Sequence, residues 1–131
     1  PGFKQKEEIS LFYAISNVFI LPSISEPWGL VTNEAMACAL PVFVSNRCGC
    51  YPDIVQDGVN GFSFDPFNED RLFRLMKDVI QEKYNLDAMG GASLEIIKDY
   101  TPEKIAKIYV DAINFVVGKH ENTPYCSKPC P

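Results

Sequence analysis

Residues 23–37, SISEPWGLVTNEAMA, decide the fold of this chain. The first half, rich in Ser, Pro and Gly, is typical of a loop. From Leu30 onward the residues are good helix formers, and Pro41 cannot continue a helix. Short apolar runs at residues 18–21 and 41–45 flank this segment, and such runs are typical of buried parallel strands. Strand, loop, helix and strand together predict one unit of an α/β fold.

The pattern continues on both sides of this unit. Apolar residues at near-helical spacing predict a helix over residues 6–16. A polar loop at 46–51, a Gly- and Asn-containing turn at 57–61 and a short strand at 62–64 follow the second strand. The predicted fold is therefore α/β: a Rossmann-like, three-layer α/β/α arrangement with a short parallel sheet flanked by helices.

Three further helices are predicted after the last strand, over residues 68–81, 85–98 and 101–117, the last one capped by Thr101 with Pro102 as its first residue. The first and third carry apolar stripes that we expect to pack in the core or against another surface: Leu72, Leu75, Met76 and Val79, and Ile105, Ile108, Tyr109, Ala112, Phe115 and Val116. We expect the last helix to pack against a domain outside this chain, so that part of its stripe is exposed here. We expect residues 1–117 to form one domain and residues 118–131 to be a tail.

Length and composition narrow the class of protein. A chain of 131 residues with 47% hydrophobic and 22% charged residues suits one globular domain. Its apolar runs are far shorter than the ~20 residues of a membrane span, and no signal peptide is visible. The net charge of -5 argues against a general nucleic-acid surface. We therefore expect a cytoplasmic protein that does not bind nucleic acid, although a helix N-terminus can still bind a small anion.

Five cysteines leave two interpretations open. An odd number without a secretory signal favours reduced thiols. The alternative is a four-thiolate zinc site formed by Cys48, Cys50, Cys126 and Cys130, but neither pair has the usual spacing of structural zinc sites. We predict free thiols and no metal.

The candidate site lies where the loop at 23–29 meets the following helix. Ligands of open parallel sheets bind beyond the carboxyl ends of the strands, and a helix start offers N–H groups and a positive dipole end to a pyrophosphate. Gly29 has no side chain to keep a ligand away from the backbone. Glu26 and Glu34 bracket this helix start. Because a carboxylate beside a phosphate is unfavourable, we expect each of them to accept hydrogen bonds from sugar hydroxyls.

This segment resembles a known family. Glu26 and Glu34, separated by seven residues that include Pro-Trp-Gly-Leu-Val and followed by Ala-Met-Ala, resemble the donor-site motif of retaining GT-B glycosyltransferases. That large family includes sucrose synthases and many bacterial polysaccharide enzymes. Residues 40–42, the loop around Gly49 and residues 57–62 fit the same family in order and spacing. The resemblance covers about residues 2–117 and implies the C-terminal, nucleotide-sugar-binding domain.

The resemblance implies a role for each motif position. Glu34 would hold the ribose hydroxyls of the nucleotide, and Glu26, the candidate catalytic residue, would hold a hydroxyl of the donor sugar. The pyrophosphate and sugar would meet the backbone N–H groups of four successive residues: Trp28, Gly29, Leu30 and Val31. The loop at Phe3 would contact the base. Transfer to an acceptor (a glycan, a lipid or a small molecule) would retain the anomeric configuration and need neither metal nor cofactor.

Departures from the family pattern limit what we expect of this chain alone. The family's N-terminal domain is absent, as are the first strands of the C-terminal domain, which carry the Arg and Lys that neutralise the leaving phosphate. We therefore expect the chain alone to be inactive, and any peripheral membrane association to come through the parent enzyme. Ala39 stands where a helix-ending Gly is common, so we expect the helix to end without a left-handed residue. Cys50 replaces the second glycine of its loop.

Other interpretations compete with the enzyme. The chain could be a non-catalytic module that binds a nucleotide sugar or acts with a partner. A flavodoxin-like regulatory domain shares the fold class, but its acidic cluster or phosphate-binding loop is missing. Either core packing or ligand contact could explain Trp28. The remaining candidates are expected to be structural or inert: Asn46, Arg47, the turn at Asn60 and His120 in the tail.

Overall fold

The computed structural model describes residues 4–118, and the chain divides into two compact units between Asp99 and Tyr100. The second unit contains one long helix. The elements of the first unit, in chain order, are α1 (Lys6–Ala14), β1 (Phe19–Leu21), α2 (Leu30–Ala37), β2 (Val42–Ser45), β3 (Gly61–Phe64), α3 (Glu69–Ile80) and α4 (Leu86–Ile97). A 3-10 turn, η1 (Lys98–Tyr100), spans the division in the chain, and α5 (Pro102–Val116) belongs to the second unit.

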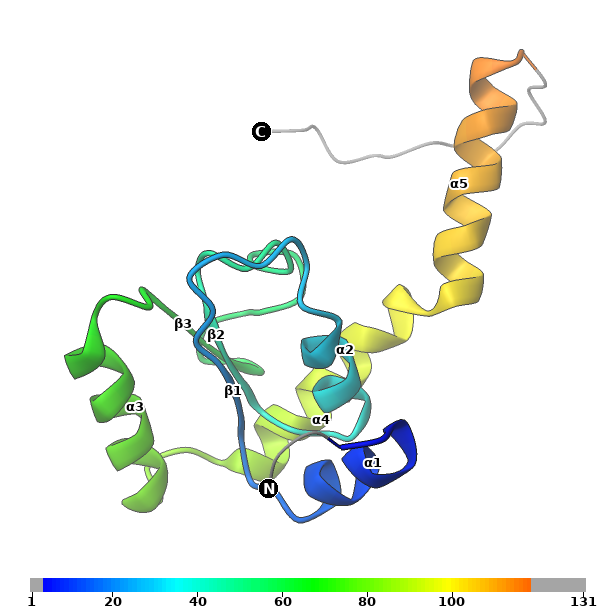
Figure 1. Ribbon diagram of the computed structural model, residues 1–131. Helices are drawn as coiled ribbons and strands as arrows, with labels where there is room; N and C mark the ends of the chain where they lie inside the picture. Colours follow the sequence, from blue (N-terminus) through cyan, green and yellow to red (C-terminus); the bar gives the residue numbers. More distant parts are fainter. Residues whose placement is uncertain (1–3, 119–131) are drawn as a thin grey trace. The chain divides into compact units, whose positions relative to one another are not determined.

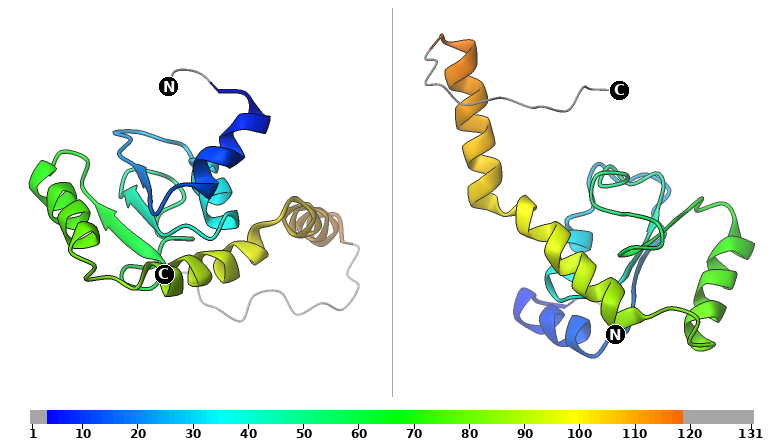
Figure 2. Two further views of the ribbon diagram at one scale, coloured as in Figure 1. Left: turned by 90° about the horizontal axis from the view of Figure 1, so that it is seen from below. Right: turned by 180° about the vertical axis from the view of Figure 1, so that it is seen from behind.

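The sheet has three parallel strands in the order β1-β2-β3. Phe43 of the central strand lies opposite Ile20 of β1 and Phe62 of β3. Helix α3 covers one face of the sheet, and α2, with α1 and α4 beside it, covers the other (Figures 1 and 2). The α/β fold with a short parallel sheet between helices, predicted from the alternation of elements, is therefore confirmed.

The central strand supplies both faces of the core. All four residues of β2 are buried, because helices cover the sheet on both sides. Phe43 packs with Phe64 and with Leu75 of α3 on one face. Because side chains alternate along a strand, Val42 and Val44 point to the opposite face, toward α2. The continuous apolar run that predicted a buried strand is explained by this two-sided cover.

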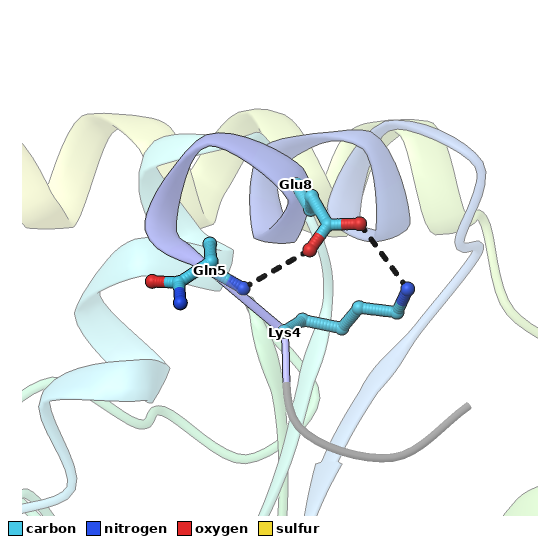
Figure 3. Close-up of polar contacts among 3 residues, drawn as sticks. All are labelled: Lys4, Gln5 and Glu8. Carbon is cyan, nitrogen blue, oxygen red and sulfur yellow. Dashed lines mark hydrogen bonds and ion pairs between the residues drawn. The ribbon is translucent and has the colours of Figure 1, made fainter.

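Helix α1 begins with a reciprocal cap that fixes its first turn. The backbone N–H of Gln5 donates to Oε2 of Glu8 at 3.2 Å, and Lys4 Nζ lies 3.2 Å from the other oxygen of that carboxylate (Figure 3). The helix ends at Ala14, two residues before the predicted end, with Ile15 as its C-cap. This helix positions Tyr13 beside α2.

Side-chain caps also start the helices that follow the sheet. Asn68, Asn85 and Thr101 accept hydrogen bonds from backbone N–H groups in the first turns of α3, α4 and α5. The predicted stripe of α3 is correct for Leu75, which is buried, and for the half-buried Leu72 and Val79. Met76 is 46% exposed and is not part of this core cluster.

Helix α5 does not bury its apolar stripe within its own unit. No residue of α5 is buried, and Ile108, Tyr109, Phe115 and Val116 are each more than half exposed. This exposure agrees with the expectation that part of the stripe is uncovered in this chain. Among residues 4–118, no helix is long and apolar enough to cross a membrane.

The end of α2 corrects the expectation for Ala39. Its φ of 56° is left-handed, and the N–H groups of Ala39 and Leu40 donate to the carbonyls of Met36 and Ala35 at 3.0 and 3.1 Å. These two bonds form a complete Schellman motif with alanine in the position that glycine usually occupies. The carbonyls at the helix end are satisfied by the motif, and this gain offsets the strain of about 1–2 kcal/mol expected for a side chain in that conformation.

Replacing Ala39 with glycine is therefore expected to stabilise the chain by about 0.5–1 kcal/mol. Relief of the left-handed strain exceeds the extra freedom that glycine adds to the unfolded state. The free energy of unfolding in urea measures the change. Ala37→Gly, two residues earlier in the helix, is the control and should destabilise instead. Equal losses for both variants would contradict the left-handed helix end.

Candidate functional site

Two loops pair with each other beyond the carboxyl ends of β1 and β2. Glu26 and Cys48 form a parallel bridge that continues the pairing of the two strands. The Gly49 N–H donates to the Glu26 carbonyl at 2.9 Å, and the Cys50 N–H donates to the Trp28 carbonyl at 3.1 Å. The loops lie side by side at one end of the sheet (Figure 1). The loop that carries the predicted donor motif is therefore held in place by its neighbour.

The start of α2 differs from the starts of the helices after the sheet. Its N-cap is Gly29, in a left-handed conformation with φ 91°, and this residue offers no side-chain hydrogen bond. A Cβ at Gly29 would lie 3.0 Å from Leu21 and 3.3 Å from Cγ of Glu26. The positive end of the helix dipole thus faces the loop without a side-chain cap from its N-cap residue.

Glu34 lies on the side of α2 that faces α1. Its Oε2 accepts a hydrogen bond from the Tyr13 hydroxyl at 3.0 Å. The carboxylate is exposed and lines a largely apolar pocket of about 280 Å³, whose walls are Ile9, Ser10, Tyr13, Glu34, Ala37 and Cys38. Burial, and then the Glu34 carboxylate, raises the pKa of Tyr13 far above its usual range, so the phenol stays protonated and can donate. Sequence reasoning missed this role, because Tyr13 fits the apolar face of its helix.

Glu26 has a different environment. It is half-buried at the bridge between the two loops, and among residues 4–118 its carboxylate has no hydrogen-bond or ion-pair partner. Burial, then Cys50 and then the charge of Glu26, raises the pKa of the Cys48 thiol to about 11. The two glutamates therefore have different neighbours: Glu34 lies against α1, and Glu26 lies against the second loop.

The indole of Trp28 holds the loop onto the helix. Its Nε1–H donates to Oδ1 of Asn33 at 2.9 Å, and the side chain is half-buried. The ring therefore has a structural contact within the protein, and a ligand role for Trp28 stays a prediction. Leu30 and Val31 are exposed at the first turn of α2, 68% and 40% respectively. Asn33 was not singled out from sequence, because an Asn inside a helix carries no distinctive pattern.

The cysteines that the structure describes are free thiols. Cys38 is exposed, whereas Cys48 and Cys50 are buried. The Cys50 thiol donates to the Thr32 hydroxyl at an Sγ–Oγ1 distance of 3.8 Å, so it points into the core rather than to the surface of its loop. No group of three or more potential metal ligands occurs among residues 4–118. Cys126 and Cys130 of the zinc alternative lie outside those residues, as do Phe3 and His120.

The remaining polar candidates have structural contacts. The Arg47 guanidinium lies over the Phe67 ring at 5.1 Å from its centroid. Asn60 is fully buried, accepts a hydrogen bond from the Gln56 N–H at 2.8 Å and donates one to the Ile54 carbonyl at 2.9 Å. A structural role for Asn60 is thus confirmed, although it extends well beyond the predicted turn.

Comparison with known proteins identifies the family. The family model described as "Glycosyl transferases group 1" matches residues 1–95, and the chain belongs to this family. Sulfoquinovosyl transferase SQD2 of Arabidopsis thaliana is 36% identical over 102 residues, which are 76% of this chain and 20% of that protein. Alpha-monoglucosyldiacylglycerol synthase of Acholeplasma laidlawii is 36% identical over 124 residues, 86% of this chain and 29% of that protein. The chain thus spans less than a third of the length of these two relatives.

Solved structures agree on the fold. Sucrose-phosphate synthase from Thermosynechococcus elongatus superimposes with a TM-score of 0.78 over 92% of this chain and 30% of that chain, at 24% sequence identity. The fold is therefore the Rossmann-like type of GT-B glycosyltransferases. The donor-binding roles of Glu26, Trp28, Gly29, Leu30, Val31 and Glu34 stay predictions.

Proposed function

We propose that this chain holds the nucleotide-sugar donor of a retaining glycosyltransferase at the carboxyl end of its sheet. The observation that carries the proposal is the start of α2, where the N-cap Gly29 contributes no side-chain hydrogen bond while the N-caps of α3, α4 and α5 do. Uncapped N–H groups and the helix dipole suit a pyrophosphate. In this proposal the backbone from Trp28 to Val31 binds the diphosphate, without a metal ion or cofactor.

The two glutamates divide the rest of the donor between them. Glu34 lines a pocket on the α1 side of α2, and in our proposal its free oxygen accepts a hydrogen bond from the ribose. Glu26, at the bridge between the two loops, accepts a hydrogen bond from the donor sugar. A carboxylate without a protein partner is suited to a hydroxyl donor, because hydrogen bonds to charged groups are stronger than neutral ones.

Transfer itself is proposed for a catalytic unit that includes this chain. The names of the two relatives above indicate glycosyl transfer and glycolipid synthesis, and the chain matches 20% and 29% of their lengths. We propose that this chain contributes the donor site of the same reaction class and that the acceptor binds elsewhere in the unit. A non-catalytic donor-binding module would share this site and would lack transfer in the whole protein.

Replacement of each glutamate by alanine tests the division of roles. Glu34→Ala is expected to weaken binding of both a nucleoside diphosphate and its sugar derivative about 10-fold, because a charged hydrogen bond contributes about 1.5 kcal/mol or more. Glu26→Ala is expected to weaken only the sugar derivative. Calorimetric titration with UDP, GDP and ADP and with their glucose derivatives measures both effects.

Glu95→Ala is the matched control, since it removes an exposed carboxylate of α4 that pairs with Lys98. It should leave every dissociation constant unchanged. Unchanged affinity in Glu34→Ala would refute the ribose role, and equal losses for both ligand types in Glu26→Ala would refute the sugar role. If the wild-type chain binds none of these nucleotides, the proposed donor site is wrong.

A further inference from the structure

The hydroxyl of Tyr13 joins α1 to the side of the proposed donor site. It lies 3.0 Å from Oε2 of Glu34 and 3.4 Å from the carbonyl oxygen of Val31. A phenol has one hydrogen to donate, and the shorter distance and the negative charge favour the carboxylate as its acceptor. Tyr13 precedes Glu34 by 21 residues, so the contact is formed only by the packing of two helices.

The Tyr13 ring is itself held in a defined position. It is half-buried, and its edge meets the ring of Phe19 in β1, with the centroids 6.1 Å apart and the planes at 65°. Edge-to-face contact of this kind restricts the ring. This contact limits the directions from which the phenolic oxygen can present its proton to Glu34.

The contact uses one carboxylate oxygen and leaves the other. Among residues 4–118, Tyr13 is the only residue that donates a hydrogen bond to the Glu34 side chain. Oε1 thus stays available to a ligand that enters the adjoining pocket. Burial and the nearby carboxylate raise the pKa of the Tyr13 phenol far above its usual range, so the phenol keeps its proton at neutral pH.

We propose that Tyr13 is a positioning residue of the donor site, which fixes the Glu34 carboxylate so that Oε1 faces the ribose hydroxyls. The proposal rests on the proposed function. It assigns Tyr13 no contact with the donor, so Tyr13 acts only through Glu34. A carboxylate held in one orientation binds a diol more tightly than a mobile one, since less freedom is lost on binding.

A double-mutant cycle with Tyr13→Phe and Glu34→Ala tests this. The probe is whichever of UDP, GDP and ADP the chain binds most tightly, and its dissociation constant is measured by calorimetry. Tyr13→Phe is expected to weaken binding about 3- to 10-fold and to have no further effect in the Glu34→Ala background. Phenylalanine keeps the ring contact with Phe19, so the thermal midpoint should change little.

The preference for ribose over deoxyribose is the second measurement. This preference would not change if Tyr13 only stabilised the fold. The wild-type chain should bind the ribonucleoside diphosphate more tightly than its 2′-deoxy form, and Tyr13→Phe should reduce that ratio. Tyr84→Phe is the matched control, because Tyr84 also donates to a carboxylate, Oδ2 of Asp78, at 3.2 Å and is not part of the site. It should leave affinity and ratio unchanged.

The outcomes separate the two proposals. If Glu34→Ala weakens binding and Tyr13→Phe does not, the positioning role is wrong and the donor site stands. The positioning role is also wrong if Tyr13→Phe weakens binding just as much in the Glu34→Ala background, since Tyr13 would then act independently of Glu34. If Glu34→Ala has no effect on binding, or if none of the three diphosphates binds, both the donor site and the positioning role are refuted.

Discussion

Replacing Gly49 with alanine is expected to destabilise the chain by about 3 kcal/mol and to abolish measurable binding of a nucleoside diphosphate. A Cβ at this position would lie 1.8 Å from the carbonyl oxygen of Pro27 and 2.8 Å from its carbonyl carbon. Both atoms belong to backbone, so no rotamer change relieves the collision and one loop must move. The Gly49 N–H bond to the Glu26 carbonyl would be lost with that movement.

The binding loss follows from the position of this contact. The loop at residues 23–29 leads into the start of α2, and its pairing with the second loop is what holds Glu26 at the sheet edge. A displacement of about 1 Å at a site of this kind costs affinity steeply, because the donor groups no longer converge on one ligand. We therefore expect binding to suffer even at temperatures where the variant is folded.

Urea unfolding and calorimetric titration of the same samples measure the two effects. Gly58→Ala is the control: Gly58 has a left-handed φ of 77°, but a Cβ there would meet no atom within 4 Å. It should cost only the conformational strain of about 1–2 kcal/mol and leave nucleotide affinity unchanged. Similar stability losses for the two variants would contradict the close approach of the loops.

Replacing Asn60 with alanine is expected to destabilise the chain by about 3–4 kcal/mol. The side chain is fully buried, and its removal would leave the Gln56 N–H and the Ile54 carbonyl without their partners. Ile54 is buried, and an unsatisfied buried acceptor costs about 1–3 kcal/mol. Gln56 is exposed, so the lost bond to its N–H adds the net value of one hydrogen bond, about 0.5–1.5 kcal/mol. Asn60→Asp should also destabilise strongly, because it replaces the donated bond to Ile54 with a buried charge.

Ser93→Ala provides the matched control for this buried network. The Ser93 hydroxyl donates to the backbone carbonyl of Asn60 at 3.4 Å. The same backbone carbonyl also accepts a hydrogen bond from the Val42 N–H at 3.1 Å. Because the acceptor keeps a partner, the loss should be about 1 kcal/mol. Urea unfolding midpoints compare the stability of the three variants. If Asn60→Ala loses no more stability than Ser93→Ala, Asn60 does not link the loop to the sheet.

Local patterns in the chain were sufficient for the type and order of the elements. The apolar run at β2 predicted a strand buried on both faces, and helix formers after Gly29 predicted α2. Predicted boundaries differ from the observed ones by one or two residues, because helix ends depend on caps that form only in three dimensions. The motif around Glu26 and Glu34 led to the same family that the comparisons identify.

Ala39 is a position where local reasoning was wrong, and Met76 is one where helical spacing did not decide burial. Ala39 adopts the left-handed conformation because two hydrogen bonds of the helix end stabilise it there. Met76 has the correct helical spacing for the core and yet is exposed, because spacing gives a direction and not the width of the neighbouring surface. The exposure of the α5 stripe, by contrast, agrees with the expectation from sequence.

Residue types and their spacing along the chain were enough to specify a parallel α/β fold and to place Glu26, Gly29 and Glu34 around a helix start. Packing between distant segments decided the rest: Tyr13 reaches Glu34 from α1, and Gly49 meets Pro27 across two loops. Cys50 likewise turns inward to Thr32. Periodicity and helix propensity act over a few residues, whereas these contacts join residues that are 18 to 22 positions apart in the chain.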